Sequence, residues 1–266
     1  MATDVKHPKV VPHADWLAAR KDFLVKEKEF TRLRDELSKQ RREMPWEKVE
    51  KSYVFDGSGG KETLADLFDG RSQLIVYHFM FGPGWKEGFP SCSYLADHFD
   101  GMTIHLAHRD VTFAAISRVP IAGIEAFKNR MEWRFHWVSS FGSDFNYDYH
   151  VSFTLEEREN GKVHYNYGEM EFPSEEGPGL SVFLKDSGGE IYHTYSSYAR
   201  GLDILVGTYN FLDLAPKGRD ESGFAHTMAW VRHHDKYDGG YFVDAAQTYQ
   251  EPAKAEASCC SSEHHP

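Results

Sequence analysis

The chain has 266 residues, a formal net charge of −11 at pH 7 and 41% hydrophobic residues. This composition is typical of a packed globular protein, and the length suits one elaborated domain. The negative charge argues against nucleic-acid and anionic-membrane partners, because both need a basic binding surface. The sequence shows no membrane-spanning run, no signal-peptide core and only three cysteines, so we expect a cytoplasmic protein without a disulfide framework.

Residues 15–43 predict one long helix, in which large apolar residues recur at every seventh position: Trp16, Phe23, Phe30 and Leu37. This stripe is compatible with a homo-oligomer seam. Because the heptad pattern is short, we expect instead that it packs on the chain's own core. Residues 1–50 are therefore assigned to an N-terminal helical extension, whose helix ends at Pro45.

Strand and helix patterns alternate from residue 51 onward. Continuous apolar runs indicate buried strands, and amphipathic stretches between them indicate helices. Strands are expected at 52–60, 72–81, 110–118 and 134–140, and helices at 91–109 and 121–133. This β-α-β-α-β alternation predicts an α/β domain, at 51–247, with a mainly parallel sheet flanked by helices.

The second half of this domain is less regular. Residues 155–177 are polar and acidic, and we interpret them as an insertion. Two strand patterns surround an Asp-Ser-Gly-Gly turn within 178–197, which predicts a hairpin. Residues 201–214 predict a closing helix, and we expect 248–266, which include Cys259 and Cys260, to be a disordered tail.

Cys92 follows a Gly- and Pro-rich turn that joins a predicted buried strand to a predicted helix. A helix N-terminus favours a thiolate, because its unpaired N–H groups and its dipole stabilise negative charge. The position of Cys92 therefore indicates a reactive thiol. The alternative is an inert cysteine buried in the first helical turn.

Several strings of residues resemble one family, in the same order along the chain. They are LIVYHFMFGPGW (74–85), PSCS (90–93), DVTFAAISR (110–118), SDFNYD (143–148), PGLSVF (178–183) and MAWVRHHDKYD (228–238). Over about residues 16–241 the chain resembles the thioredoxin-like family catalogued as domain of unknown function 899. The resemblance implies a thioredoxin-like fold of the peroxiredoxin-type variant and a dithiol-disulfide oxidoreductase activity.

The chain departs from that family at one thiol. The family turn usually reads Gly-Cys-Pro-Ser-Cys, whereas here Phe89 replaces the first, attacking cysteine. Dithiol exchange within the turn is thereby excluded. A peroxidatic site would also need Thr or Ser at this position. The resemblance still implies a site formed by Cys92, Phe89, Trp85 and Pro178, with Pro178 as a cis proline facing the turn.

Histidine is abundant, with 15 in the chain. Imidazole binds copper, zinc and iron well, and two histidines three residues apart on a helix can face one metal ion. A transition-metal site is therefore a second hypothesis, with six candidate ligands: His78, His105, His108, His136, His150 and His193. The adjacent His233 and His234 are interpreted as structural.

Three functions remain open from the sequence. The first is an oxidoreductase acting on a small molecule, the second a metal-dependent (Cu, Zn or Fe) enzyme, and the third a non-catalytic binding or assembly module. Four tyrosines would suit an aromatic or quinone-like substrate if they lined a pocket. They are Tyr147, Tyr149, Tyr165 and Tyr167, for which a place at the rim of the core is the simpler interpretation.

Overall fold

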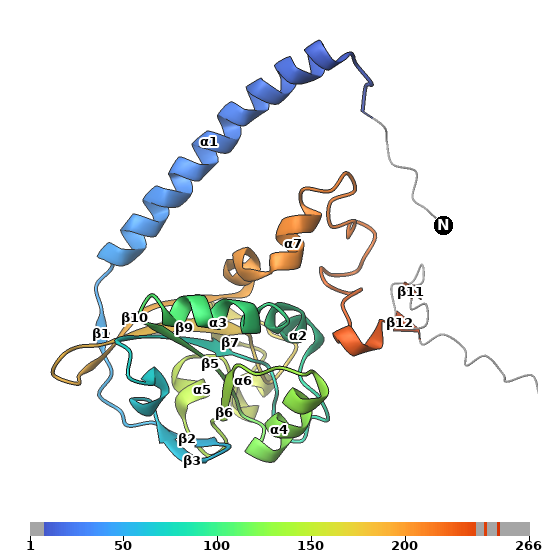
Figure 1. Ribbon diagram of the computed structural model, residues 1–266. Coiled ribbons are helices and arrows are strands. Elements are labelled where there is room, and N and C mark those ends of the chain that lie inside the picture. Colours follow the sequence, from blue (N-terminus) through green and yellow to red (C-terminus); the bar gives the residue numbers. More distant parts are fainter. Residues whose placement is uncertain (1–7, 238–241, 244–248, 251–266) are drawn as a thin grey trace, which may run out of the picture.

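A computed structural model describes residues 8–237, 242–243 and 249–250. The first element is the helix α1 (His13–Glu43), which ends before Pro45 because the residue preceding a proline favours an extended backbone. Figure 1 shows α1 projecting away from the rest of the chain. None of its residues is buried, so the expectation that it packs on the chain's own core is wrong. The core is filled by residues from Tyr53 onward.

The main sheet has eight strands, in the spatial order β1-β10-β9-β4-β5-β6-β2-β3. Their bounds, in chain order, are β1 (Glu47–Lys48), β2 (Val54–Gly57), β3 (Gly60–Thr63), β4 (Gln73–His78), β5 (Val111–Ser117), β6 (His136–Ser139), β9 (Gly179–Lys185) and β10 (Ile191–Tyr198). The hairpin predicted around the Asp-Ser-Gly-Gly turn is the β9–β10 pair.

The expectation of a mainly parallel sheet is wrong. Only β4–β5 and β5–β6 are parallel among the neighbouring pairs, and every other pair is antiparallel. For the β2–β3 and β9–β10 pairs, the physical reason is the length of the connections. Helical crossovers follow β4 and β5, whereas short turns join β2 to β3 and β9 to β10, and a short turn can join only antiparallel strands.

The α-helices after α1 are α2 (Pro90–Ala96), α3 (Phe99–Ala107), α4 (Ile121–Arg130), α5 (Phe145–Asp148), α6 (Leu155–Glu159) and α7 (Gly207–Leu212). Single turns of 3-10 helix are η1 (Asp66–Phe68) and η3 (His234–Lys236), and η2 (Ala199–Leu205) is longer. Two small sheets pair β7 (Val163–Tyr165) with β8 (Gly168–Met170), and β11 (Phe242–Val243) with β12 (Tyr249–Gln250). None of the helices in the described part of the chain is long and apolar enough to cross a membrane.

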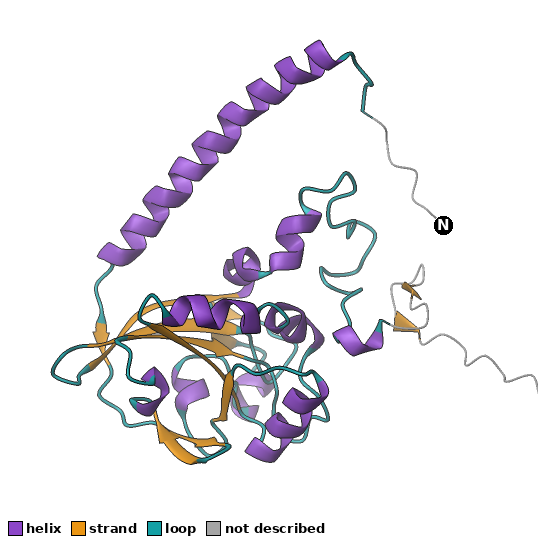
Figure 2. Ribbon diagram, in the orientation of Figure 1, coloured by secondary structure: helices purple, strands orange, loops and turns teal. Residues whose placement is uncertain are grey.

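Helices lie on both sides of the sheet (Figure 2). On one face, α2, α3 and α4 bury a cluster that includes Tyr77, Cys92 and Phe127. On the other face, η1 and α5 bury a second cluster around Phe68 and Phe145. Neighbouring residues of a strand point to opposite faces, so Tyr77 faces Cys92 whereas the His78 ring packs against Phe145. The strand β4 therefore separates the thiol from this histidine.

Candidate active site

A cavity of about 370 Å³ lies beside Cys92, and we call it the Cys92 cavity. Four segments far apart in the sequence line it: residues 77–95, 172–178, 199–209 and 226–228. Most of its lining is apolar or aromatic, with side chains that include Tyr77, Met80, Phe89, Leu95, Phe172, Leu202, Val206, Tyr209 and Met228. The cavity therefore offers flat and apolar surface around one thiol.

The turn before α2 brings Phe89 and Cys92 to this cavity. Gly84 has a φ of +82°, a left-handed conformation that glycine adopts without a steric penalty. The Phe89 backbone N–H then donates to the carbonyl of Met80 at 3.0 Å, which closes the turn. The Phe89 side chain is 39% exposed at the cavity edge. Phe89 thus forms part of the cavity wall beside Cys92.

Residues near the C-terminal end hold this turn in place. The buried His233 ring contacts the Gly88 carbonyl through Nε2 at 2.8 Å. The Glu87 carboxylate accepts from Arg130 at 2.6 Å and from Lys236 at 2.8 Å. At Gly88 a Cβ atom would lie 2.6 Å from Phe79, so a larger residue would displace the turn. The structural role predicted for His233 agrees with these contacts.

The opposite wall of the cavity is the loop 171–178. Trp85 donates from Nε1 to the Glu175 carboxylate at 2.7 Å, which joins the turn to this loop. Glu176 is buried and accepts from Arg118 at 3.0 Å and from Ser152 at 2.5 Å. Burial raises the pKa of Glu176 to about 7, although both partners oppose this shift. Two carboxylates therefore hold the loop in place: Glu175 through Trp85, and Glu176 through Arg118 and Ser152.

Pro178 lines the cavity, as the resemblance implied, but its peptide bond is trans. The described residues contain no cis peptide bond, so the expected cis proline is a wrong prediction. The trans isomer is the lower in energy for most X-Pro bonds. Local hydrogen bonds accompany it here: the Tyr165 hydroxyl donates to the Pro178 carbonyl at 2.6 Å, and the Gly177 N–H donates to Val151 at 2.8 Å.

The Cys92 thiol is buried, with 2% of its surface exposed. Burial raises its pKa to about 11, although a hydrogen bond from the Tyr77 hydroxyl opposes the shift. The stabilised thiolate expected from a helix start is therefore not what the structure supports. The helix α2 has only seven residues, and the loss of hydration outweighs what its first turn supplies. Cys92 is a protonated thiol at neutral pH.

The six candidate metal ligands do not converge. Within the described residues, no group of three His, Cys, Asp or Glu side chains is placed to hold a metal ion. His105 on α3 and His108 just after it are exposed, and His136 contacts the Glu62 carboxylate at 2.9 Å. The His150 ring lies beside His164, at 4.5 Å between ring centroids. The metal hypothesis has no support from this arrangement.

The remaining two candidates, His78 and His193, are linked through hydrogen bonds. His78 Nε2 contacts the hydroxyl of Ser181 at 2.8 Å, and Ser181 contacts that of Ser196 at 2.8 Å. Ser196 in turn contacts His193 Nε2 at 2.7 Å. His78 is fully buried, and burial lowers its pKa to about 3. These contacts lie on the sheet face opposite Cys92 and give His78 a structural role.

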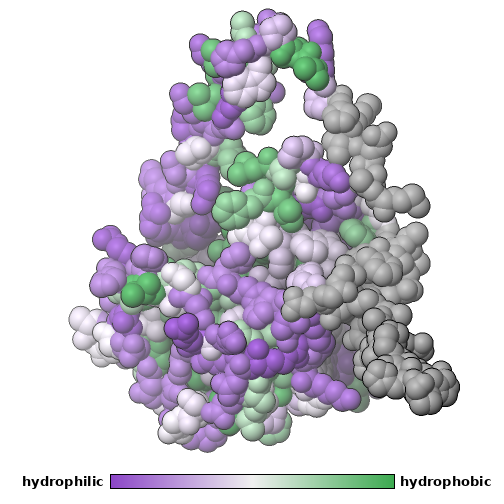
Figure 3. All heavy atoms as spheres, turned by 45° about the vertical axis from the view of Figure 1, so that its right-hand side comes forward, coloured by the Kyte–Doolittle hydropathy of each residue, from purple (hydrophilic) through white to green (hydrophobic). Residues whose placement is uncertain are grey.

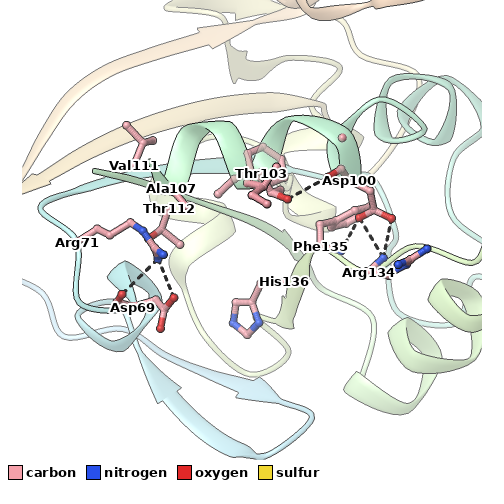
Figure 4. Close-up of a pocket in the computed structure, with 13 residues that line it drawn as sticks. Asp69, Arg71, Asp100, Thr103, Ala107, Val111, Thr112, Arg134, Phe135 and His136 are labelled. Atoms are coloured by element: carbon pink, nitrogen blue, oxygen red, sulfur yellow. Dashed lines mark hydrogen bonds and ion pairs between the residues drawn. The ribbon is translucent and has the colours of Figure 1, made fainter. Parts of the chain in front are cut away.

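A larger groove, of about 630 Å³, lies beside α3 and contains His136 (Figure 4). Two of its charged side chains, Asp100 and Arg71, are engaged in contacts within the chain. The Asp100 carboxylate accepts from the backbone N–H groups of Arg134 and Phe135, and Arg71 is paired with Asp69 at 2.7 Å. The groove contains no thiol and no buried titratable side chain. We therefore place the candidate site at the Cys92 cavity.

The four tyrosines expected near an aromatic substrate do not line the Cys92 cavity. Tyr165 is buried and holds the Pro178 carbonyl, and the other three lie beside separate clefts. The aromatic lining comes instead from Tyr77, Phe89, Phe172 and Tyr209. Sequence reasoning found Phe89 and Cys92 but missed the lining at 199–209 and 226–228. No local pattern marks those residues as neighbours of Cys92.

Several solved structures share a similar backbone arrangement. Peroxidoxin BcpB from Mycobacterium tuberculosis is 13% identical, with a TM-score of 0.38 over 61% of this chain and 94% of that chain. A cysteine-to-serine mutant of peroxiredoxin Q from Xanthomonas campestris is 13% identical, with a TM-score of 0.40 over 59% and 90%. A hypothetical protein from Sinorhizobium meliloti 1021 is 12% identical, with a TM-score of 0.37 over 56% and 70%. Similarity this low says nothing about activity.

No curated protein matches the chain. A family model described as "Bacterial protein of unknown function (DUF899)" matches residues 5–237. The match includes all four segments that line the Cys92 cavity and the C-terminal residues that hold its turn. The resemblance seen in the sequence is thereby confirmed at the level of the family: this chain belongs to the family of bacterial proteins of unknown function called DUF899.

Proposed function

We propose that this protein is an oxidoreductase that binds a small, largely apolar and aromatic substrate in the Cys92 cavity. It does so without dithiol exchange inside the site. The observation that carries the proposal is the cavity itself, in which one thiol is surrounded by aromatic and aliphatic side chains. A cleft or cavity with a largely apolar lining and a few polar groups is the usual form of a small-molecule site.

The lining indicates the chemical class of the substrate. Tyr77, Phe89, Phe172 and Tyr209 present ring surface, against which a flat molecule can pack. Polar and charged side chains also belong to the lining: Ser91, Arg200, Asp203, His226 and Thr227. A substrate with an aromatic body and one polar end would satisfy both parts of the cavity.

Cys92 is assigned to contact the substrate. Because its pKa is raised to about 11, it is not an attacking thiolate in the resting protein. Phe89 leaves the turn without a second thiol, so a disulfide within the turn cannot form. The Tyr77 hydroxyl is hydrogen-bonded to Cys92 and lowers the pKa of the thiol, as does the backbone of Met80.

The protonated state of Cys92 also favours a second function, a non-catalytic binding module in the same cavity. In that case the sulfur is only a polarizable part of the wall. The two functions differ in what happens to the bound molecule, because an oxidoreductase changes its redox state and a binding module returns it unchanged.

The test begins with binding. We expect quinones and related aromatic molecules to raise the melting temperature of the full-length protein. Phe89→Ala should weaken binding about fivefold, since an aromatic contact contributes on the order of 1 kcal/mol. Phe141→Ala, also an exposed phenylalanine but outside the cavity, should leave affinity unchanged.

The second stage measures turnover of a bound quinone with a thiol reductant supplied in solution. We expect Cys92→Ser to retain binding and lose turnover. If the wild-type protein binds but does not turn over, the binding module is the correct function. Absence of binding by every molecule in the panel, or equal effects of Phe89→Ala and Phe141→Ala, would reject the cavity as the site.

A further inference from the structure

The helix α1 carries a long apolar stripe that nothing in the described chain covers. Trp16, Phe23, Phe30, Leu33 and Leu37 are each between 53% and 67% exposed. Leu17, Leu24 and Val25 are also exposed, but at about 100° per residue they lie on the other side of the helix. The contact between α1 and the rest of the chain is near its end, where Arg41 lies over the Tyr195 ring at 4.7 Å. Stable single chains rarely leave so much apolar surface in water.

The spacing of the stripe suits pairing with another helix. Trp16, Phe23, Phe30 and Leu37 are seven residues apart, and Leu33 adds the intermediate position of a heptad. On a straight helix such a stripe drifts by about 20° per heptad, and a left-handed supercoil with a second helix removes the drift. A second copy of this chain supplies a helix with the same spacing.

The exposed area is what a stable dimer needs. The five side chains of the stripe, of roughly 200 Å² each and more than half exposed, present on the order of 600 Å² of apolar surface. A second uncovered group on η2 and α7 consists of Ile204, Leu205, Phe211 and Leu214. Together the two groups reach the contribution of about 800 Å² that each partner makes to an interface of standard size. Apolar side chains gather on the projecting helix and again on the surface beneath it (Figure 3).

Other occupants of the stripe fit less well. Residues 251–266 contain no Leu, Ile, Val, Met, Phe, Tyr or Trp, so that end of the chain has no large apolar side chain to offer. Within α1, nine Lys and Arg residues are interspersed with seven Asp and Glu residues, which weakens attraction to an anionic membrane.

We propose that this protein is a homodimer in which the α1 stripe of each copy packs against the second copy. The interface consists of the two α1 stripes, and the η2–α7 group of each copy adds apolar surface beside them. This inference is independent of the proposed function, because no α1 residue lines the Cys92 cavity.

The test is the mass of the full-length protein in sedimentation and light scattering. We expect the wild-type chain to have twice its monomer mass at micromolar concentration. Phe23→Glu/Phe30→Glu should halve that mass, because charge cannot be buried in the stripe. Lys21→Glu/Lys28→Glu, which places two acidic residues on the opposite helix face, should leave the mass doubled. Melting curves check that each variant is folded.

A wild-type monomer at these concentrations would overturn the proposal, and so would a stripe variant that stays dimeric. A monomer that co-sediments with phosphatidylserine vesicles would assign the stripe to a membrane surface and overturn the proposal as well. If the double variant fails to fold, the single change Leu33→Gln provides the same test, with at least a tenfold weaker dimer expected.

Discussion

Burial of the Cys92 thiol influences its pKa more than its position in the first turn of α2 does. We expect its thiolate absorbance to titrate near pH 11, because burial raises the pKa to about that value. Tyr77→Phe should raise the pKa further, since the Tyr77 hydroxyl stabilises the thiolate. Both titrations use a Cys259→Ser/Cys260→Ser chain, in which Cys92 is the one remaining thiol. A titration near the usual value of ~8.5 would contradict this account.

Because His78 is buried, we expect the free energy of unfolding to fall as the pH is lowered. Its pKa is lowered from 6.5 to about 3 in the folded chain, so the unfolded chain binds more protons between these values. Its contribution to stability is present above pH 6.5 and is lost as pH falls toward 3. The total loss is up to ~5 kcal/mol at ~1.4 kcal/mol per pKa unit. We expect His78→Gln to flatten the fall in unfolding free energy below pH 6.5, measured by urea denaturation.

The matched control is His105→Gln, which changes an exposed histidine on α3. Its unfolding free energy should follow the wild-type curve across the same pH range. If both variants retain the wild-type slope, the acid sensitivity does not come from the buried imidazole.

The loop 171–178 is the element whose stability we expect to depend on pH with the opposite sign. The pKa of Glu176 is raised from 4.5 to about 7, so the folded chain binds more protons in this range. Its contribution is fully present below pH 4.5 and is lost as pH rises through 7, by up to ~3 kcal/mol. Glu176→Gln should remove this loss, whereas Glu175→Gln, the neighbouring carboxylate, should retain it. Equal slopes for the two variants in urea denaturation would contradict the assignment.

Among the elements, those with a strong local pattern were predicted well. The strands β4, β5 and β6 and the helices α1 and α4 lie within or close to their expected ranges. The helix expected at 91–109 is instead split into α2 and α3. At the break, Asp97 accepts from Trp133 Nε1 at 2.9 Å and contacts His234 at 2.7 Å. The closing helix became η2 and α7. In these places contacts with distant residues prevailed over local periodicity.

For the whole molecule, the sequence indicated the α/β class but not the direction of most strands. Strand direction in β1, β2 and β9 depends on which distant strand each one joins, and residue patterns do not carry that information. Of the four residues expected at the candidate site, Trp85 does not line the cavity. Cys92, Phe89 and Pro178 do share one cavity, because the β4–α2 turn and the start of β9 are neighbours in the sheet. The histidines were grouped by their abundance and by the spacing of His105 and His108, and the fold distributes them over separate elements.

The pairing of Gly88 with His233 has a consequence for how the protein is made. A chain emerging from the ribosome supplies the β4–α2 turn long before the residue that holds it. Until residues 226–236 have been synthesised, the Cys92 cavity lacks one of its four walls and the Gly88 carbonyl lacks its partner. In the nascent chain Cys92 therefore lacks part of its final cover, and we expect its thiol to be oxidised more readily before synthesis is complete than afterwards.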